Sequence, residues 1–278
     1  MKRKWNVALV GLGFGGAFVP VYRHHPEVGL LGLCDADGEK ARRFQDRYRC
    51  DRVYASLDEV LADPDIDAVH LVTPIPLHEE QTVRVLESGR HCACTVPMAL
   101  ILEGLQRIID AVRSSGKTYM MMETSVYTTH FLQVREMVQQ GAFGRIQMVR
   151  GAHYQDMEHW PEYWKGLPPM HYATHAIAPM VMVLDSPIVQ VHGFGTGRMR
   201  QELVEPYGNP YPMECAVFRF ADGTVGEATR ALFASARGYT ESFCVYGESQ
   251  AFEWQQVEEE DPVLFVLGNT VPDGNGGF

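Results

Sequence analysis

The stretch "PPMHYATHAIAP", residues 168–179, holds the residue types and spacing best suited to chemistry in this chain. It places His171 and His175 four positions apart. On a helix these positions share a face, so the pair fits metal ligands, catalytic groups or a buried polar seam. A catalytic zinc site needs a third protein ligand, and nothing in the sequence marks His153 or His159 as that ligand. We therefore predict no metal site and favour His175 as a catalytic residue.

Three neighbouring groups offer further protic chemistry. Tyr172 follows His171, and the two prolines before them favour an irregular start to the helix. Tyr154 ends a strand pattern, where active-site residues often emerge, although it also fits a tyrosine packed on the sheet. Glu123 follows an apolar strand and is either a buried acid with a raised pKa or half of a surface ion pair. His171 itself is either a catalytic group or a residue that caps or orients its neighbours.

A second candidate site lies in the glycine-rich stretch "VALVGLGFGG", residues 7–16. An apolar strand pattern precedes the glycines and a helix pattern follows them, as in the G-x-G-x-x-G turn that binds dinucleotides. Such glycines permit a tight turn and close approach of the backbone to a pyrophosphate, which the helix N-terminus also attracts. The predicted cofactor-binding residues of this turn are Gly11, Gly13, Phe14, Gly15 and Gly16.

Asp35 ends the next strand pattern, 19 residues beyond Gly16. A carboxylate at this place binds the ribose hydroxyls of the adenosine and repels a 2′-phosphate. The sequence therefore predicts NAD as the cofactor rather than NADP. The alternative is a doubly wound sheet whose tight turn binds no nucleotide.

The elements that must position these groups fall into two parts. Up to about residue 121, short apolar runs alternate with helix patterns, which predicts a parallel sheet with helices on both faces. A capping box at Ser56 and Glu59 begins one of these helices. We expect a Rossmann domain, doubly wound around its parallel sheet, over residues 1–121.

The rhythm changes in the second part, residues 122–278. One helix pattern precedes several strand patterns with turn residues between them, and Asp222-Gly223 reads as a hairpin turn. Strands joined by hairpins form an antiparallel sheet, so we expect a second α/β domain that carries the substrate site. The complete fold class is therefore α/β, with two domains of different sheet type.

Composition narrows the partners. The chain has 278 residues and a net charge of −11, without a basic block, which argues against nucleic acid or an anionic membrane surface. No stretch of about 20 apolar residues is present to span a membrane. The six cysteines form no Cys-x-x-Cys pair, and no A-x-A-like cleavage site follows the N-terminal apolar run. We expect a cytoplasmic protein with free thiols.

Taken in order, these motifs resemble the Gfo/Idh/MocA oxidoreductases, the glucose–fructose oxidoreductase and inositol dehydrogenase family. The resemblance adds "AVHLVTPIPLHEEQTVRVLESGRH" (68–91) and "CTVPMAL" (94–100) to the glycine-rich turn and the histidine segment. It implies an open, mainly antiparallel sheet in the second domain, which often forms a homo-oligomer interface. It also implies that the cofactor contacts Thr73, Pro74, His78, Thr95, Val96 and Pro97.

Three positions depart from the family pattern. Val96 stands at the family's catalytic lysine, Thr95 at the glutamate before it, and His171 at its catalytic aspartate. In these places the chain is more similar to the NAD-dependent glycosidases related to α-N-acetylgalactosaminidase, through Val96-Pro97, "MMME" (120–123) and "YATHAIAP" (172–179). The resemblance implies an active site of Glu123, Tyr154, Tyr172 and His175.

Three functions follow from this resemblance. The first is an NAD-dependent oxidoreductase that moves hydride from a sugar or sugar derivative without the family's lysine. The second is a redox-neutral glycosidase, in which transient oxidation of the sugar permits elimination of the aglycone before water and hydride add back. The third is a regulatory module that binds NAD without catalysis, because the family includes repressors that keep the fold.

Overall fold

The computed structural model describes residues 3–205 and 207–268. The chain divides into two compact units, Met1–Met122 and Glu123–Phe278. The boundary expected from the sequence lay after residue 121. No helix in the described ranges is long and apolar enough to cross a membrane.

The first unit is built on a six-stranded sheet in the order β3-β2-β1-β4-β5-β6, with every neighbouring pair parallel. This confirms the doubly wound arrangement predicted from the alternating pattern. The sequence patterns missed β3, which is only three residues long. The strands are β1 (Trp5–Val10), β2 (Val28–Cys34), β3 (Arg52–Tyr54), β4 (Ala68–Leu71), β5 (His91–Thr95) and β6 (Tyr119–Met122).

Successive residues of the central strand β1 enter two different cores. Ala8 and Val10 belong to one apolar cluster and Leu9 to another, as expected of a parallel sheet covered on both faces. Ser56 accepts a hydrogen bond from the Glu59 N–H at 3.2 Å, so the predicted helix start is confirmed. The helices are η1 (Phe14–Phe18), α1 (Val19–His24), α2 (Gly38–Tyr48), α3 (Leu57–Ala62), η2 (Ile75–Leu77), α4 (His78–Glu87) and α5 (Leu102–Ser115).

The second unit is built on a seven-stranded sheet in the order β13-β12-β11-β7-β10-β9-β8. Among the described strands of this sheet only β7 and β10 pair in parallel, so the predicted mainly antiparallel sheet is confirmed. The Asp222-Gly223 turn joins two antiparallel strands as predicted, with Gly223 at φ +92°. The strands are β7 (Ile146–Tyr154), β8 (Ile188–Thr196), β9 (Met213–Phe220), β10 (Val225–Ala231), β11 (Thr240–Gly247), β12 (Gln250–Glu253) and β13 (Val263–Val266).

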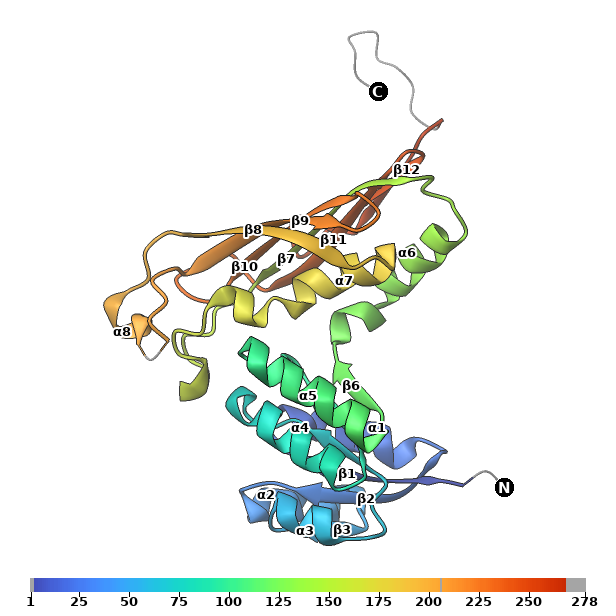
Figure 1. Cartoon of the computed structure of the whole chain (residues 1–278), viewed down its shortest axis with the longest axis vertical. Coiled ribbons are helices and arrows are strands. Elements are labelled where there is room, and N and C mark those ends of the chain that lie inside the picture. Colours follow the sequence, from blue (N-terminus) through green and yellow to red (C-terminus); the bar gives the residue numbers. More distant parts are fainter. Residues whose placement is uncertain (1–2, 206, 269–278) are drawn as a thin grey trace. The chain divides into compact units, whose positions relative to one another are not determined.

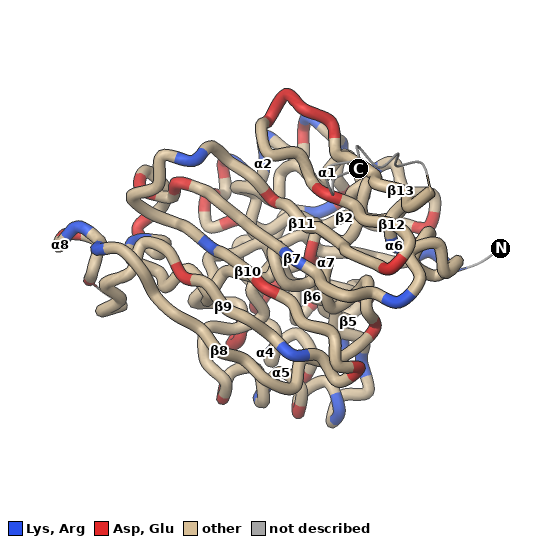
Figure 2. The backbone as a smooth tube through the Cα atoms, turned by 90° about the horizontal axis from the view of Figure 1, so that it is seen from above, with Lys and Arg blue, Asp and Glu red and all other residues tan. Residues whose placement is uncertain are grey.

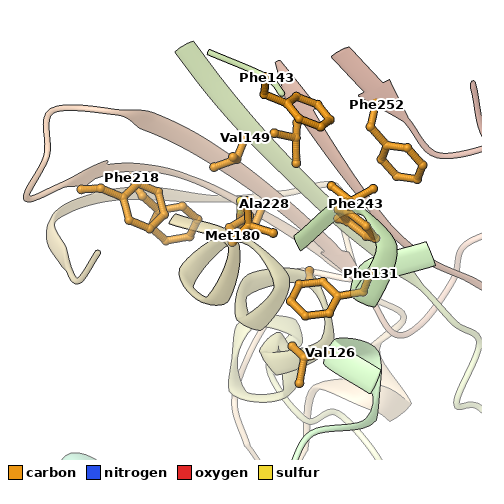
Figure 3. Close-up of a cluster of buried hydrophobic side chains, with 14 of the residues drawn as sticks. Val126, Phe131, Phe143, Val149, Met180, Phe218, Ala228, Phe243 and Phe252 are labelled. Carbon is orange, nitrogen blue, oxygen red and sulfur yellow. The ribbon is translucent and has the colours of Figure 1, made fainter. Parts of the chain in front are cut away.

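Helices α6 and α7 cover one face of this second sheet (Figure 1). The core lies between them and the strands, where Phe131 of α6 and Met180 of α7 meet Phe218 and Phe243 of the sheet in one apolar cluster (Figure 3). The helices of this unit are η3 (Thr124–Tyr127), α6 (Thr129–Gln139), η4 (Glu162–Trp164), η5 (Pro169–Tyr172), α7 (Thr174–Leu184) and α8 (Gln201–Val204).

Helix α7 lies unusually close to strand β7 at one point. A Cβ atom added to Gly151 would sit 1.9 Å from the Ala176 carbonyl oxygen, so only glycine permits this approach. Ala176 follows His175 in the first turn of α7, and both are buried. Gly151 therefore sets how deeply the histidine-bearing end of α7 sits against the sheet.

The opposite face of the second sheet carries charged side chains on its central strands. Figure 2 shows basic and acidic residues along neighbouring strands of this sheet, and Arg150 of β7 forms an ion pair with Glu227 of β10. Residues alternate between the faces of a strand, which puts Tyr154 on the same side as Arg150. The acidic run from Glu258 to Asp261 is exposed, as its composition predicts.

Candidate active site

A buried carboxylate orients the principal histidine of the second unit. Glu123, the first residue after β6, is 4% exposed, and its Oε1 lies 2.5 Å from Nδ1 of His175. The same oxygen accepts the backbone N–H of Ser125 at 2.9 Å. Burial acts to raise the pKa of Glu123, but the hydrogen bond and charge of His175 hold it below its usual value. The raised pKa considered from the sequence is therefore wrong, and Glu123 is a carboxylate that fixes the imidazole.

Tyr172 meets the other side of the same imidazole. Its hydroxyl lies 3.1 Å from Nε2 of His175. Burial raises the pKa of Tyr172, although the charge of Arg230 acts against this shift. Glu123, His175 and Tyr172 thus form one hydrogen-bonded series, in which Nδ1 donates to the carboxylate and Nε2 presents its lone pair to a phenol.

Arg230 lies beneath this series and is fully buried. Its guanidinium donates to the carbonyl oxygens of Tyr172 at 2.8 Å and His153 at 2.9 Å, and it stacks 5.4 Å from the ring centroid of Tyr172. Burial lowers the pKa of Arg230 to about 9. The arginine joins the η5 turn to the end of β7 and holds Tyr172 in place.

His153, Glu241 and Tyr239 complete the cluster from the strand side. His153 of β7 is 1% exposed, and its ring packs edge-on against that of His175 at 5.0 Å. Glu241 of β11 pairs with His153 in the sheet register, and its Oε1 lies 3.9 Å from Nε2 of both histidines. The Tyr239 hydroxyl donates to Glu241 in a very short hydrogen bond.

The cluster opens into a pocket of about 260 Å³ within the second unit. His175, Tyr239 and Glu241 offer it polar groups, and Phe243 and Trp254 offer it apolar surface. A concave site with an aromatic wall and a few convergent polar groups suits a small polar ligand. The arrangement combines imidazole nitrogens, phenols and carboxylates around one cavity.

The structure brings together three of the five catalytic candidates, namely Glu123, Tyr172 and His175. His171 lies outside the helix, because α7 begins at Thr174 and His171 belongs to the preceding 3₁₀ turn. The predicted helical face shared by the two histidines is therefore wrong, and His171 is exposed. Tyr154 lines a second pocket with Arg150 on the face of the sheet opposite the helices, so the structure does not bring it to this cluster.

Sequence reasoning missed four members of the cluster: His153, Arg230, Tyr239 and Glu241. The sequence did contain a signal for His153. Side chains alternate along a strand, so Arg150 and Tyr154 lie on one face of β7 and His153 lies on the other. The prediction of no metal site rested on the lack of a third ligand beside His171 and His175. In the structure a different group, His153, His175 and Glu241, holds its potential ligand atoms within 4.8 Å of one another.

In the first unit, the glycine-rich turn follows β1 and fits a pyrophosphate. A Cβ at Gly11 would lie 2.4 Å from the Val72 carbonyl oxygen, and its φ of +92° also requires glycine. A Cβ at Gly16 would meet the Phe44 ring at 2.5 Å, whereas none of the described atoms lies within 4 Å of a Cβ at Gly13. Gly13 precedes the N-terminus of η1 and leaves the open space that close approach of a phosphate needs.

Asp35 lies at the end of β2, beside this turn. Its Oδ2 accepts the Leu12 N–H at 2.6 Å, and its Oδ1 accepts the Asp37 N–H at 2.8 Å. Lys40 forms an ion pair with it at 3.2 Å. The carboxylate therefore links the turn to the start of α2. This is the place where a carboxylate that binds the adenosine ribose is expected.

The loops after β4 and β5 are joined by a buried histidine. The ring nitrogens of His78 each lie 2.8 Å from a carbonyl oxygen, one of Thr73 and the other of Pro97. Burial lowers the pKa of His78, although both carbonyl groups act to raise it. His78 is 1% exposed and thus shapes the loops that carry Thr73, Pro74, Thr95, Val96 and Pro97. Val96 is buried and supplies no titratable group.

Comparison with known proteins agrees with both units. A family described as "Oxidoreductase family, NAD-binding Rossmann fold" matches residues 5–123, and one described as "GFO/IDH/MocA C-terminal domain" matches residues 131–253. A Glycosyl hydrolase family 109 protein of Porphyromonas gingivalis is 30% identical over 203 residues, which cover 65% of this chain and 42% of that protein. A second protein of that family, from Bacteroides thetaiotaomicron, is 29% identical over 65% of this chain and 43% of its own length. The matched region thus spans less than half of these curated relatives.

Solved structures show the same fold. Levoglucosan dehydrogenase in complex with NADH and levoglucosan superposes with a TM-score of 0.81 at 22% identity, covering 99% of this chain and 79% of that one. A putative myo-inositol dehydrogenase from Sinorhizobium meliloti 1021 gives a TM-score of 0.76 at 19% identity, covering 94% and 75%. The chain belongs to the Gfo/Idh/MocA oxidoreductase family, and its first unit is an NAD-binding Rossmann domain.

Proposed function

We propose that this protein is an NAD-dependent oxidoreductase that acts on a hydroxyl group of a sugar or sugar derivative. The observation that carries the proposal is the Glu123–His175–Tyr172 series beside the 260 Å³ pocket. The Nε2 atom of His175 is an acceptor with a fixed orientation, and removal of a hydroxyl proton requires such an acceptor. The names of the relatives and structural neighbours support a carbohydrate as the substrate class.

In this proposal the second unit supplies the proton chemistry. NAD, when bound, would supply the acceptor for the hydride of the carbon whose hydroxyl is deprotonated. His175 takes the hydroxyl proton on Nε2, and Glu123 stabilises the resulting imidazolium through Nδ1–H. Tyr172 and Tyr239 donate hydrogen bonds to the substrate or relay the proton, while Trp254 provides an aromatic surface for the ring. Val96, at the place of the family's lysine, contributes no base.

The residues that hold NAD in this proposal are those of the first-unit site. The turn Gly11–Gly16 would hold the pyrophosphate, and Asp35 would hold the adenosine ribose. Thr95 at the end of β5 and the loops that contain Thr73, Pro74, Val96 and Pro97 would hold the nicotinamide end, with His78 keeping the two loops together.

The test is to incubate the full chain with NAD and a panel of polyols, sugars and glycosides, and to measure NADH formation and product release. His175→Ala should abolish turnover while NAD affinity remains unchanged. His159→Ala removes an exposed histidine of the same unit and should retain turnover. A wild-type protein that binds NAD but turns over no member of the panel would favour a regulatory module instead.

A redox-neutral glycosidase is the second candidate. It is favoured by the relatives named Glycosyl hydrolase family 109 and by the valine at position 96. Such a reaction needs a second base for a C–H proton, and Glu241, which lines the pocket, is the candidate for this base. In heavy water, this reaction predicts deuterium at C2 of the released sugar and no accumulation of NADH. Steady NADH formation with an intact glycosidic bond identifies a net dehydrogenase.

We also infer that the protein is a homo-oligomer through the second sheet. Phe194 of β8 is 72% exposed and Val217 of β9 is 51% exposed, on the face opposite the helices. Adjacent exposed apolar residues on a sheet indicate an interface. Light scattering should show more than one chain per particle, and Phe194→Glu should reduce the mass to that of one chain of 31.3 kDa. A monomeric wild type would contradict this inference.

A further inference from the structure

We propose that His153, His175 and Glu241 form a binding site for a divalent metal of the zinc class. All three belong to the second unit and come from β7, α7 and β11. Glu241 Oε1 lies 3.9 Å from Nε2 of each histidine, and the three ligand atoms lie within 4.8 Å of one another. Two imidazoles and one carboxylate make up the protein ligand set of many catalytic zinc sites.

His153 supplies the observation that points to a ligand. Its side chain is 1% exposed, and neither ring nitrogen has a hydrogen-bond partner among the described residues. A buried polar group without a partner is costly, and such groups are rare in folded proteins. Both nitrogens of this imidazole are therefore available to a ligand that enters the cluster, and imidazole is a common metal ligand.

His175 is oriented in the way that metal-binding histidines are. Its Nδ1 donates to the buried Glu123 carboxylate, which leaves the lone pair on Nε2. A carboxylate behind the histidine fixes the tautomer and increases the basicity of the metal-binding nitrogen. Glu123 is thus placed to hold His175 in the tautomer that binds a metal through Nε2.

The distances require a modest contraction. Tetrahedral zinc ligands at about 2.0–2.1 Å from the metal lie about 3.4 Å from one another, and the Glu241 contacts are 3.9 Å. Rotation of the Glu241 side chain, which is 21% exposed, shortens its own two contacts, and the two imidazole rings must also turn towards each other, because the group as a whole is held only within 4.8 Å. Glu241 also lines the pocket, so the fourth position of the metal faces open space.

Metal binding changes the hydrogen bonds of two tyrosine hydroxyls. The Tyr172 hydroxyl leaves Nε2 of His175, and the Tyr239 hydroxyl shares Glu241 with the ion. Burial raises the pKa of both tyrosines, so each is a neutral donor. Loss of one neutral hydrogen bond is small beside the affinity that three zinc ligands provide.

The test uses the full chain, without a histidine tag, after treatment with a chelator and gel filtration. The protein is titrated with Zn²⁺ and desalted, and its metal content is measured by mass spectrometry. We expect one zinc per chain. Co²⁺ should give the visible absorption of a four- or five-coordinate site with nitrogen ligands. A metal that binds the folded state should also raise the unfolding temperature.

Four variants separate this site from other histidines. His153→Gln and Glu241→Gln should each abolish stoichiometric binding, and Glu123→Gln should weaken it by about 10- to 100-fold. His171→Ala removes the exposed neighbour and should bind one zinc per chain. Circular dichroism in chelator establishes that each variant is folded. Substoichiometric zinc in the wild type, or equal binding by wild type, His153→Gln and Glu241→Gln, would overturn the proposal.

Metal binding and the proposed proton transfer both require the lone pair on Nε2 of His175, so one excludes the other. Zinc on Nε2 of His175 prevents that atom from accepting a proton, so zinc should inhibit the turnover proposed above and leave NAD affinity unchanged. The binding experiment requires neither NAD nor a sugar. Its failure therefore leaves the proposed oxidoreductase standing, and an inactive protein that binds zinc leaves the metal site standing.

Discussion

The Glu123 carboxylate lies 2.5 Å from Nδ1 of His175, although the two residues are 52 positions apart in the chain. Glu123 stands directly after the last strand of the first unit's sheet, whereas His175 lies in the first turn of α7. The contact fixes which nitrogen of the imidazole faces the pocket. It therefore makes Glu123 a positioning residue whose effect is measurable separately from its effect on folding.

Glu123→Gln should lower kcat by about 10²-fold, on the scale of general acid–base catalysis, with little change in KM or NAD affinity. The amide cannot stabilise a protonated His175, and it no longer enforces one tautomer. The ¹⁵N chemical shifts of the His175 ring should show a mixture of tautomers in the variant and one tautomer in the wild type. Unchanged shifts together with unchanged kcat would remove Glu123 from this role.

Two alanine substitutions in the glycine-rich turn should separate folding from cofactor binding. Gly11→Ala places a Cβ 2.4 Å from the Val72 carbonyl oxygen at a positive φ, so we expect a loss of about 1–3 kcal/mol in the free energy of unfolding. Gly13→Ala meets no described atom within 4 Å and should change that free energy by less than about 1 kcal/mol. It should nevertheless weaken NAD binding, measured by calorimetry, because the methyl group occupies the approach of the pyrophosphate. Wild-type affinity in Gly13→Ala would contradict the assigned pyrophosphate site.

Asp35→Ala should weaken NAD binding by about 1–3 kcal/mol, the scale of leaving hydrogen-bonding groups without partners. Asp35→Asn keeps an acceptor for the Leu12 N–H and should mainly reduce the preference for NAD over NADP. Asp37→Ala is the matched control, since Asp37 caps α2 two residues further on. It should reduce stability by about 1 kcal/mol and leave NAD affinity unchanged. Tighter binding of NADP than NAD by the wild type would refute the role given to Asp35.

Arg230→Met should reduce the free energy of unfolding by at least about 3 kcal/mol, because buried carbonyl oxygens lose their donors. Arg230→Lys restores charge but not the planar fork of donors, so it should recover only part of this loss. Arg219→Met, on the exposed side of β9, should have an effect within about 0.5 kcal/mol. Urea unfolding followed by circular dichroism measures all three. Equal stability of the Arg230 and Arg219 variants would show that the buried guanidinium is dispensable.

His70 should contribute to acid sensitivity of the first unit. It is 1% exposed in β4, its Nδ1 lies 3.0 Å from the Tyr22 hydroxyl, and burial lowers its pKa to about 4. As pH falls below about 6.5, the unfolded chain takes up this proton before the folded protein does, so stability is lost between about pH 6.5 and pH 4. From pH 7 to pH 5 the wild type should lose about 2 kcal/mol more than His70→Gln in urea unfolding. A parallel pH dependence of the two proteins would contradict this.

Most of the fold was predictable because its signals are local. The strand runs of the first sheet are continuous and apolar, and Ser56 and Gly223 mark a helix start and a hairpin by their own chemistry. The strand β3 escaped because three residues are too few to show a period. The helix start before His175 was misplaced because two prolines and a 3₁₀ turn occupy the positions that the four-residue spacing suggested.

The site was predictable only where one segment carries it. Tyr172 and His175 are neighbours in sequence, and Glu123 was found through the resemblance. Tyr239, Glu241 and Arg230 come from strands of a sheet whose register depends on non-local pairing, so no pattern in their own segments indicates the cluster. Tyr154 was chosen over His153 from the resemblance and from its place at the end of a strand, without assigning the two faces of that strand.

Gly151 gives the site an unusual kind of vulnerability. It lies on the sheet face that carries the helices and touches no pocket wall on that face, yet a single methyl group there would push against the Ala176 carbonyl and lift the start of α7. The position of His175 thus depends on a residue that has no side chain. Mutational libraries confined to the lining of the pocket beside His175 would pass over it, because Gly151 acts on that pocket only through the backbone of α7.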